Sequence, residues 1–279
     1  MSATTTNDAR ATGGTAPLLE VRGLCAGYGA SQVLDELSFS MGVEPVSIIG
    51  RNGMGKTTLC ATLMNLVKVT AGEVVFDGER IEAKGPERIA AAGISNVPQG
   101  RRLFPSLTVD EHLRMLAKGA RGKRWTPDAV YDLFPRLAQR RSNGGAELSG
   151  GEQQMLAVGR ALLLNGKLLL MDEPSEGLAP TIVDVLIEAV HTLVAEGVAV
   201  LVVEQNIRAA TAMAQRQLVM VNGQIQAETT AAELLADPLL QRRFLGVGHA
   251  VEVEDDATPH GTTTDPVPPT PRDPAEEIR

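Results

Sequence analysis

The chain has 279 residues, of which 43% are hydrophobic and 22% are charged, and its formal net charge is −8. This composition is typical of a globular protein with a full hydrophobic core, and the absence of a bilayer-length apolar run argues against a pore-forming chain. The two cysteines, Cys25 and Cys60, are too few for a disulfide framework or a zinc site, so we expect reduced thiols in or near the core.

The two ends of the chain differ in composition from the rest. Residues 1–17 are rich in Thr, Ala and Gly and lack the basic and apolar regions of a signal peptide, which favours a disordered leader on a cytosolic protein. From residue 251 onward, eight acidic residues stand against two arginines. We expect residues 248–279 to form a disordered acidic, Pro-rich tail, because they hold few large apolar side chains to offset the entropy of ordering; an acidic docking tail is the alternative.

Between the ends, apolar runs of strand length alternate with helical patterns. Helices are expected to begin at Gly55 and at Pro180. The runs are VSIIG (46–50), ISNVPQ (94–99), KLLLMDE (167–173) and VAVLVVEQ (198–205). Continuous Val, Ile and Leu runs are typical of a parallel sheet that is covered on both faces. The sequence therefore predicts an α/β fold.

The first strong motif is GRNGMGKT, Gly50–Thr57, which follows an apolar strand and opens a helix. Its glycines let the backbone wrap around phosphate, so that successive N–H groups and the helix dipole face the negative charge. Lys56 is then expected to reach the β and γ phosphates, and Thr57 to place its hydroxyl on Mg²⁺.

The segment from about Leu107 to Gly145 shows no strand pattern. It begins with Thr108-x-x-Glu111, which has the spacing of a capping box ahead of a helix. We interpret the segment as a helical insertion.

A pair of carboxylates, Asp172 and Glu173, follows the buried strand LLLM. Open α/β sheets bind ligands at the carboxyl ends of their strands, where an Asp commonly holds Mg²⁺ through water. Glu173 is then free to polarise an attacking water as a general base. On its own such a pair often marks a solvated turn, but together with the phosphate loop it favours an ATPase.

Further along, Asn222-Gly223 separates two apolar runs and predicts a tight antiparallel hairpin beside the parallel sheet. The histidines His112, His191 and His260 are expected to be structural or solvated. Because no internal repeat is found, we expect one nucleotide-binding module.

A third motif, LSGGEQQ at Leu148–Gln154, completes a pattern that resembles the nucleotide-binding subunit of ATP-binding-cassette transporters. The pattern consists of GRNGMGKTT, Gln99 after ISNVP, LSGGEQQ, LLLMDEP and a switch position after VLVVE. The resemblance covers residues 18–247. It implies a phosphate-loop cassette with a RecA-like parallel-sheet core, an antiparallel β subdomain and a helical subdomain at about 107–160.

The resemblance also assigns site residues. Tyr28 matches the aromatic residue that stacks on adenine, and Gln99 matches a ligand of Mg²⁺ and water that senses the membrane partner. Gln205 matches the switch position, where most cassettes have His; an amide can donate a hydrogen bond to the γ-phosphate but carries no charge. The expected ATP-binding residues are Tyr28, Gly50, Arg51, Asn52, Gly53, Met54, Gly55, Lys56, Thr57, Thr58, Gln99, Ser149, Gly150, Gly151 and Asp172, with Thr57, Gln99 and Asp172 around Mg²⁺ and Glu173 and Gln205 as catalytic residues.

In this family Ser149, Gly150 and Gly151 would bind the γ-phosphate of ATP held by an opposite subunit. The resemblance therefore implies a dimer, either with itself or with a homologous second ATPase. It also implies two transmembrane permease subunits, a periplasmic-type substrate-binding protein, no nucleic-acid partner, and a peripheral position on the cytoplasmic face of the inner membrane.

Longer stretches of the sequence narrow the resemblance to one group within this family. NVPQGRRLFPSLTVDEHL, LSGGEQQMLAVGRAL and MDEPSEGLAP followed by VVEQN are similar to the second ATPase of branched-chain amino acid importers, and to its relative in urea or short-amide importers. The branched-chain group also has Gln at the switch position. A non-transport cassette ATPase is the rival; it would usually bring a second cassette or a long coiled insertion with basic surfaces. A phosphate-loop kinase would leave LSGGEQQ without a role.

Overall fold

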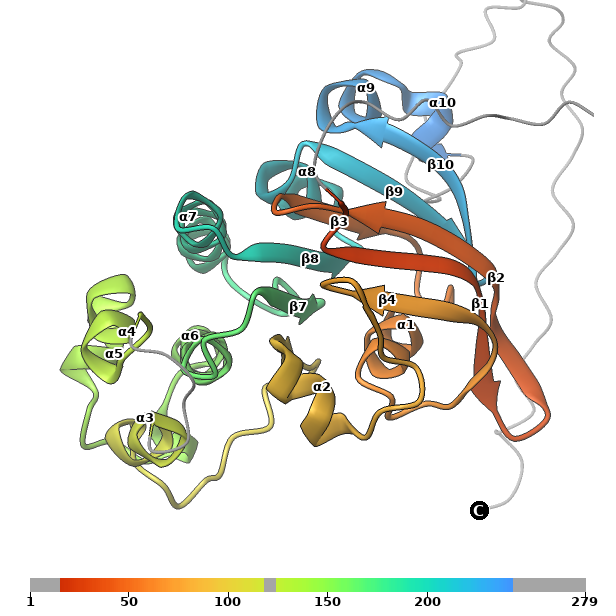
Figure 1. Cartoon of the computed structure of the whole chain (residues 1–279). Helices are drawn as coiled ribbons and strands as arrows, with labels where there is room; N and C mark the ends of the chain where they lie inside the picture. Colours follow the sequence, from red (N-terminus) through yellow and green to blue (C-terminus); the bar gives the residue numbers. More distant parts are fainter. Residues whose placement is uncertain (1–15, 118–123, 243–279) are drawn as a thin grey trace, which may run out of the picture. The chain divides into compact units, whose positions relative to one another are not determined.

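Six strands form the central sheet of the computed structural model, which describes residues 16–117 and 124–242 (Figure 1). Across the sheet the order is β10 (Gln224–Thr230), β9 (Arg216–Val221), β3 (Pro45–Ile49), β8 (Ala199–Glu204), β7 (Leu168–Asp172) and β6 (Ile94–Val97). All neighbouring pairs are parallel except β9 and β10. The predicted α/β class is confirmed, and the carboxyl ends of five parallel strands meet at one edge.

The turn between β9 and β10 is the predicted hairpin. Asn222 and Gly223 both have positive φ, 48° and 79°, as a type I′ turn requires. Its place differs from the prediction, because β9 pairs in parallel with β3 and so belongs to the central sheet itself. The hairpin therefore extends the parallel sheet instead of standing beside it.

A second, antiparallel sheet covers one face of the central sheet. Its order is β2 (Ser31–Met41), β1 (Leu19–Tyr28), β4 (Val69–Phe76) and the short β5 (Glu79–Arg80). Helix α1 (Lys56–Leu63) packs with it into one hydrophobic core, which includes Leu34, Leu59 and Leu201.

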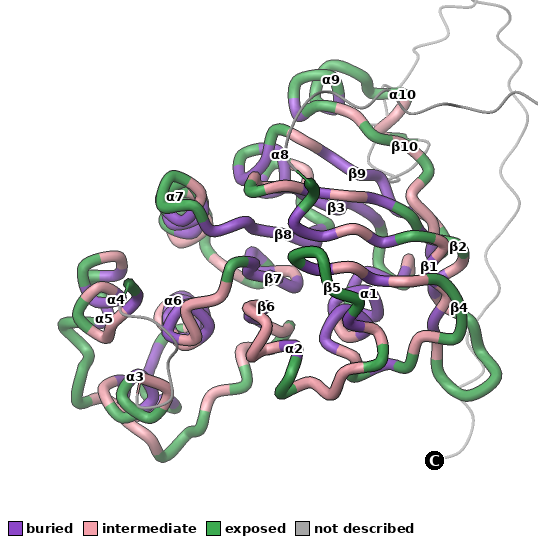
Figure 2. Tube along the Cα trace, viewed as in Figure 1, coloured by how far each residue is buried: buried purple, intermediate pink, exposed green. Residues whose placement is uncertain are grey.

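Helices α6 (Gly150–Leu162) and α7 (Pro180–Ala195) cover the opposite face. Helices α3 (Val109–Ala117), α4 (Pro127–Leu133) and α5 (Pro135–Gln139) pack against α6, and a 3₁₀ turn lies at Gly145–Glu147. Along β8, Leu201 and Val203 pack into the first core, whereas Val200 and Val202 pack into the helical one. Figure 2 shows the resulting burial of β8 and β7 along their lengths. This two-sided burial explains the continuous apolar runs in the sequence.

The remaining helices lie before β6 and after β8. Helix α2 (Pro86–Ala92) precedes β6, and α8 (Ile207–Met213), α9 (Ala231–Ala236) and α10 (Pro238–Leu240) lie near β9 and β10. Ile49, Ala210, Val219 and Leu234 form a small third core there. Within the described ranges, no helix combines the length and the apolar character that crossing a membrane requires.

The expected helical insertion is present, and its capping box forms. The Thr108 backbone N–H donates to Glu111 Oε2 at 2.8 Å, and the Glu111 N–H donates to Thr108 Oγ1 at 3.2 Å. His112 is fully buried behind this turn, where Nε2 accepts from the Phe104 N–H at 3.0 Å, so that Nδ1 carries the proton toward Thr108 O. Burial lowers the pKa of His112. These contacts confirm the structural interpretation of His112.

The other structural expectations have mixed outcomes. Both cysteines are free thiols, with Cys60 buried and Cys25 partly exposed. His191 is exposed at the surface of α7. His260 and the acidic tail lie outside the described residues, as does nearly all of the leader. The boundaries at 17, 107, 160 and 247 stay predictions.

Candidate functional site

The phosphate loop connects β3 to α1 at the carboxyl edge of the central sheet. It is fixed to the neighbouring strand by a hydrogen bond from the Gly50 N–H to Glu204 O at 3.2 Å. A Cβ at Gly50 would lie 2.6 Å from Met220 O, and Gly55 has a φ of 102°, so this path of the backbone needs glycine at both positions. The loop bounds a cavity of about 290 Å³.

Lys56 crosses this loop from the first turn of α1. Its ammonium group donates to Gly50 O at 2.8 Å and to Arg51 O at 3.0 Å, and it lies 3.0 Å from Glu173 Oε1. The side chain is only 3% exposed. Lys56 is therefore held at the floor of the cavity, in the place where a cation would meet bound phosphate.

Asp172 and Glu173 come from the end of β7, next to the phosphate loop. Thr57 Oγ1 donates to Asp172 Oδ1 at 3.1 Å. Burial raises the pKa of Asp172 to about 6, against the opposing effect of the Thr57 hydrogen bond. The Glu173 backbone has a φ of 47°, and its N–H donates to Val203 O at 2.9 Å, so its carboxylate turns toward Lys56.

Gln99 completes this group from the segment after β6. Its Nε2 donates to Glu173 Oε2 at 3.3 Å and to Glu176 Oε2 at 2.8 Å. Gln99 and Thr57 line the same cavity, and Thr57 donates to Asp172. Their amide, hydroxyl and carboxylate oxygens are a donor set that suits a hard cation such as Mg²⁺. The residues that the sequence assigned to Mg²⁺ thus fit such an ion.

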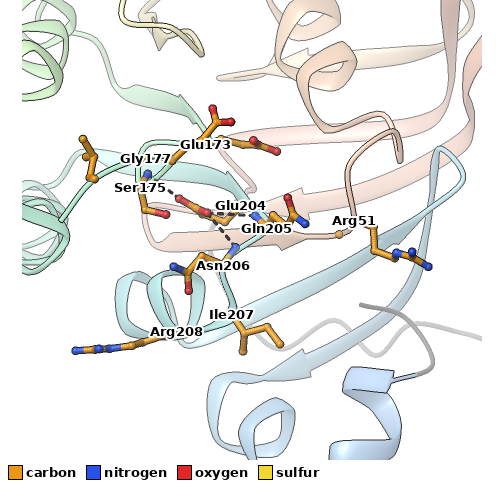
Figure 3. A pocket seen from close by; sticks show the side chains of 12 residues that line it. Arg51, Glu173, Ser175, Gly177, Glu204, Gln205, Asn206, Ile207 and Arg208 are labelled. Atoms are coloured by element: carbon orange, nitrogen blue, oxygen red, sulfur yellow. Dashed lines mark hydrogen bonds between the residues drawn. The ribbon is translucent and has the colours of Figure 1, made fainter. Parts of the chain in front are cut away.

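A second cavity of about 580 Å³ lies between the phosphate loop, the loop after β7 and the loop after β8 (Figure 3). Glu173 and Gln205 both line it, as do Gly50 and Arg51. The structure therefore places the expected catalytic base and the switch residue on the walls of one space.

The other expected nucleotide residues divide into two groups. Asn52, Gly53, Gly55 and Thr58 line the smaller cavity together with Val33 of β2. Tyr28 ends β1, in the hairpin that leads to Val33, and its side chain is 57% exposed. An aromatic ring in that position is accessible to a base.

Ser149, Gly150 and Gly151 lie at the start of α6 and line neither of these two cavities. Ser149 caps the helix through a reciprocal pair of bonds with Glu152, at 3.3 and 2.9 Å. A Cβ at Gly151 would approach Ile182 of α7 to 2.8 Å, so the small residue lets α6 start close against α7. The start of α6 thus lies apart from both cavities that the phosphate loop bounds.

Two acidic residues at this edge had no assigned role in the sequence. Glu176 accepts from Gln99, and the 2%-exposed Glu204 accepts three backbone N–H groups. The only sequence signal for Glu204 is a carboxylate directly after an apolar strand, the same signal that marked Asp172.

Known proteins resemble the chain over most of its length. A family model described as "ABC transporter" matches residues 34–176. The high-affinity branched-chain amino acid transport ATP-binding protein BraG of Pseudomonas aeruginosa is 41% identical over 222 residues, which cover 78% of this chain and 95% of the relative. The probable branched-chain amino acid transport ATP-binding protein LivF of Archaeoglobus fulgidus is 30% identical, with coverage of 80% and 97%.

Other similar proteins broaden the comparison. The lipopolysaccharide export system ATP-binding protein LptB of Haemophilus influenzae is 30% identical, with coverage of 82% and 97%. Among solved structures, a nucleotide-free ATP-binding cassette from an ABC transporter superposes with a TM-score of 0.72 at 27% identity, over 84% of this chain and all of the other. The ADP conformation of the cassette MJ1267 superposes with a TM-score of 0.68 at 28% identity, over 80% and 96%.

Proposed function

Because the chain belongs to the ABC transporter family and is one of its ATP-hydrolysing subunits, we propose that it drives solute import as a dimer that closes around two ATP molecules. The observation that carries this proposal is the convergence of Lys56, Asp172 and Glu173 within hydrogen-bonding distance of one another or of the phosphate loop. Phosphoryl transfer to water needs a cation, a metal-type carboxylate and a base, and here the start of α1 supplies the first and the end of β7 the other two.

Binding of the triphosphate is assigned to the phosphate loop. The N–H groups of Gly53, Gly55 and their neighbours, with the start of α1, would face the phosphates, and Lys56 would exchange its backbone carbonyl partners for phosphate oxygens. Thr57, Asp172 and Gln99 would hold Mg²⁺. The bound ion would neutralise part of the charge on the phosphates.

Hydrolysis is assigned to Glu173 and Gln205. The Glu173 carboxylate is the group placed to accept the proton of an attacking water, once Lys56 has turned to phosphate and no longer neutralises it. The Gln205 amide, which lines the same cavity, would donate a hydrogen bond to the γ-phosphate.

The separation between Ser149 and the phosphate loop supports a shared site. A helix start with exposed N–H groups binds phosphate, yet the cavities beside Lys56 are not lined by it. In a dimer, Ser149 of one chain would face ATP held by Lys56 of the other. ATP then stabilises the closed dimer, and hydrolysis reverses this preference, so that each cycle shifts the dimer between closed and open states.

We propose a branched-chain amino acid as the cargo, with two membrane permeases, a substrate-binding protein and either a second copy or a homologous ATPase as partners. The relative BraG, named for branched-chain amino acid transport, supports this cargo at 41% identity, whereas the relatives LivF and LptB, named for branched-chain amino acid transport and lipopolysaccharide export, are both 30% identical. Through the permeases the chain would lie on the cytoplasmic face of the membrane. Urea or a short amide is the alternative cargo, and it would be indicated if deletion of the gene abolished urea uptake and spared leucine uptake.

The phosphate-loop assignment is tested by Lys56→Ala. Because the variant lacks the cation at the floor of the cavity, we expect MgATP binding to weaken and turnover to fall by about 100-fold or more in the purified chain. Lys68→Ala, at an exposed position beyond α1, is the matched control and should match the wild type. A folded Lys56→Ala protein with unchanged ATPase activity would contradict the assignment.

A further inference from the structure

Glu204 is a buried acid at the junction of three loops, and the roles assigned above do not use it. It is the last residue of β8, and it is 2% exposed. The ion pairs formed by the described residues do not include it. Burying a carboxylate is unfavourable unless its oxygens are satisfied, so its partners indicate why it is there.

Three backbone N–H groups on two different loops donate to the Glu204 side chain, and the Ser175 side chain is a further hydrogen-bond partner. Oε1 accepts from Ser175 at 2.9 Å, and Oε2 accepts from Gln205 at 3.1 Å and from Asn206 at 3.2 Å. Figure 3 shows the carboxylate between these groups. Burial raises the pKa of Glu204, and the hydrogen bonds to Ser175, Asn206 and Gln205 oppose this change.

The two loops each carry one of the proposed catalytic groups. Ser175 lies two residues after Glu173, and Gln205 directly follows Glu204. In addition, the backbone oxygen of Glu204 accepts from Gly50 at the start of the phosphate loop, at 3.2 Å. One residue therefore contacts the phosphate loop, the loop of the base and the loop of the switch residue.

We propose that Glu204 is a positioning residue that fixes Gln205 relative to Glu173, so that both groups act on the same phosphate. This inference rests on the proposed function. A carboxylate is the group that suits this position, because each of its oxygens accepts from one of the two loops. A glutamine would offer one accepting oxygen and would turn its own N–H₂ donors toward the N–H groups of the other loop, which would release that loop.

The test is steady-state ATPase kinetics of the full chain with MgATP, for Glu204→Gln, Gln205→Ala and the double variant. We expect Glu204→Gln to lower kcat by about tenfold to 100-fold, the size of effect that a displaced catalytic group produces, while the KM for ATP stays within about twofold. The double variant should be no slower than Gln205→Ala alone. Glu233→Gln makes the same substitution at a carboxylate that accepts the Thr230 N–H in α9, and it should leave the kinetics unchanged.

An unchanged kcat in Glu204→Gln, or a rise in its KM at constant kcat, would overturn the inference. So would a double variant whose fold-loss in kcat equals the product of the two single losses, because Glu204 would then act independently of Gln205. A wild-type chain without ATPase activity would instead reject the proposed function. If Glu204→Gln does not fold, amide hydrogen exchange of the wild type tests whether Glu204 holds the two loops. Slow exchange at Ser175, Gln205 and Asn206 is expected, and exchange at the rates of an unstructured peptide at these amides would overturn the inference.

Discussion

The proposed contact between the Gln205 amide and the γ-phosphate leads to a specific kinetic prediction. A donor that contacts the γ-phosphate has no partner when ADP is bound. Removal of the Gln205 amide should therefore slow hydrolysis more than it weakens ADP binding. We expect Gln205→Ala to lower kcat by about tenfold or more, in the range seen when one transition-state donor is removed, with ADP affinity nearly intact. Turnover assays and ADP titration calorimetry measure the two quantities.

The control for this change is Gln226→Ala, an exposed glutamine on β10. It should behave as the wild type in both measurements. Equal turnover of Gln205→Ala and the wild type would make Gln205 a structural residue of the loop after β8.

Single residues were predictable where chemistry and chain position coincide. Lys56 and Thr57 belong to the phosphate-loop motif, Asp172 and Glu173 follow an apolar strand, and the structure brings the two motifs into contact. Glu204 has the same local signal, yet the role proposed for it depends on its contact with Ser175, which is 29 residues away in the chain. A contact of this kind is a property of the packed sheet, and a local pattern does not contain it.

Among the elements, the β9–β10 turn connects parts of the fold that are far apart in sequence. The Gly223 N–H donates to Met54 O in the phosphate loop at 3.0 Å, and Gly223 O accepts from Asp35 of β2 at 3.2 Å. The turn therefore links the phosphate loop to strand β2 of the antiparallel sheet through these two hydrogen bonds.

Gly223→Ala should destabilise the fold by about 2–4 kcal/mol. A Cβ there would lie 2.0 Å from Val33 O on rigid backbone, in addition to the cost of a positive φ for alanine. Gly78→Ala is the matched control, because Gly78 has the same φ of 79° and open space around it. It should cost only about 1–2 kcal/mol. Urea unfolding of the two variants measures the difference, and equal losses would contradict the steric argument.

Elements with uniform burial were the easiest to predict. Strands β7 and β8 are apolar on both faces and stand out in the sequence. Strand β1 pairs with β2 through several register shifts, which break the alternation of buried and exposed residues, and its apolar pattern is correspondingly weak. The antiparallel sheet was therefore expected from the family resemblance, whereas the parallel sheet was expected from the residues themselves.

For the whole molecule, the decisive question is whether Ser149 acts on ATP bound by another chain. Glu173→Gln keeps the size of the side chain but cannot accept a proton, so ATP should stay bound and a closed dimer should accumulate. Adding Ser149→Arg should disperse this dimer, because a long side chain at the start of α6 would block the phosphate. Sedimentation with MgATP measures the change.

Ser142→Arg provides the control, since it adds the same charge at an exposed serine seven residues before Ser149. It should leave the Glu173→Gln dimer intact. A dimer that persists with Ser149→Arg, or a Glu173→Gln protein that turns over at the wild-type rate, would contradict the shared site. If the chain prefers a homologous ATPase as its partner, the same variants are compared in the assembled transporter.

The backbone bonds that link the strand ends have a mechanical consequence. Gly50 is bonded to Glu204, and Glu173 is bonded to Val203, so the hydrogen-bonded ladder continues past the sheet into the loops that surround the phosphate. These bonds hold the loops in fixed register with the strand ends. The helices from α3 to α6 meet the sheet through a separate core of apolar side chains, and apolar contacts tolerate sliding better than a ladder of directional bonds does. If ATP hydrolysis changes the loops around the phosphate, we therefore expect the resulting displacement to fall on those helices and not on the hydrogen-bonded strand ends.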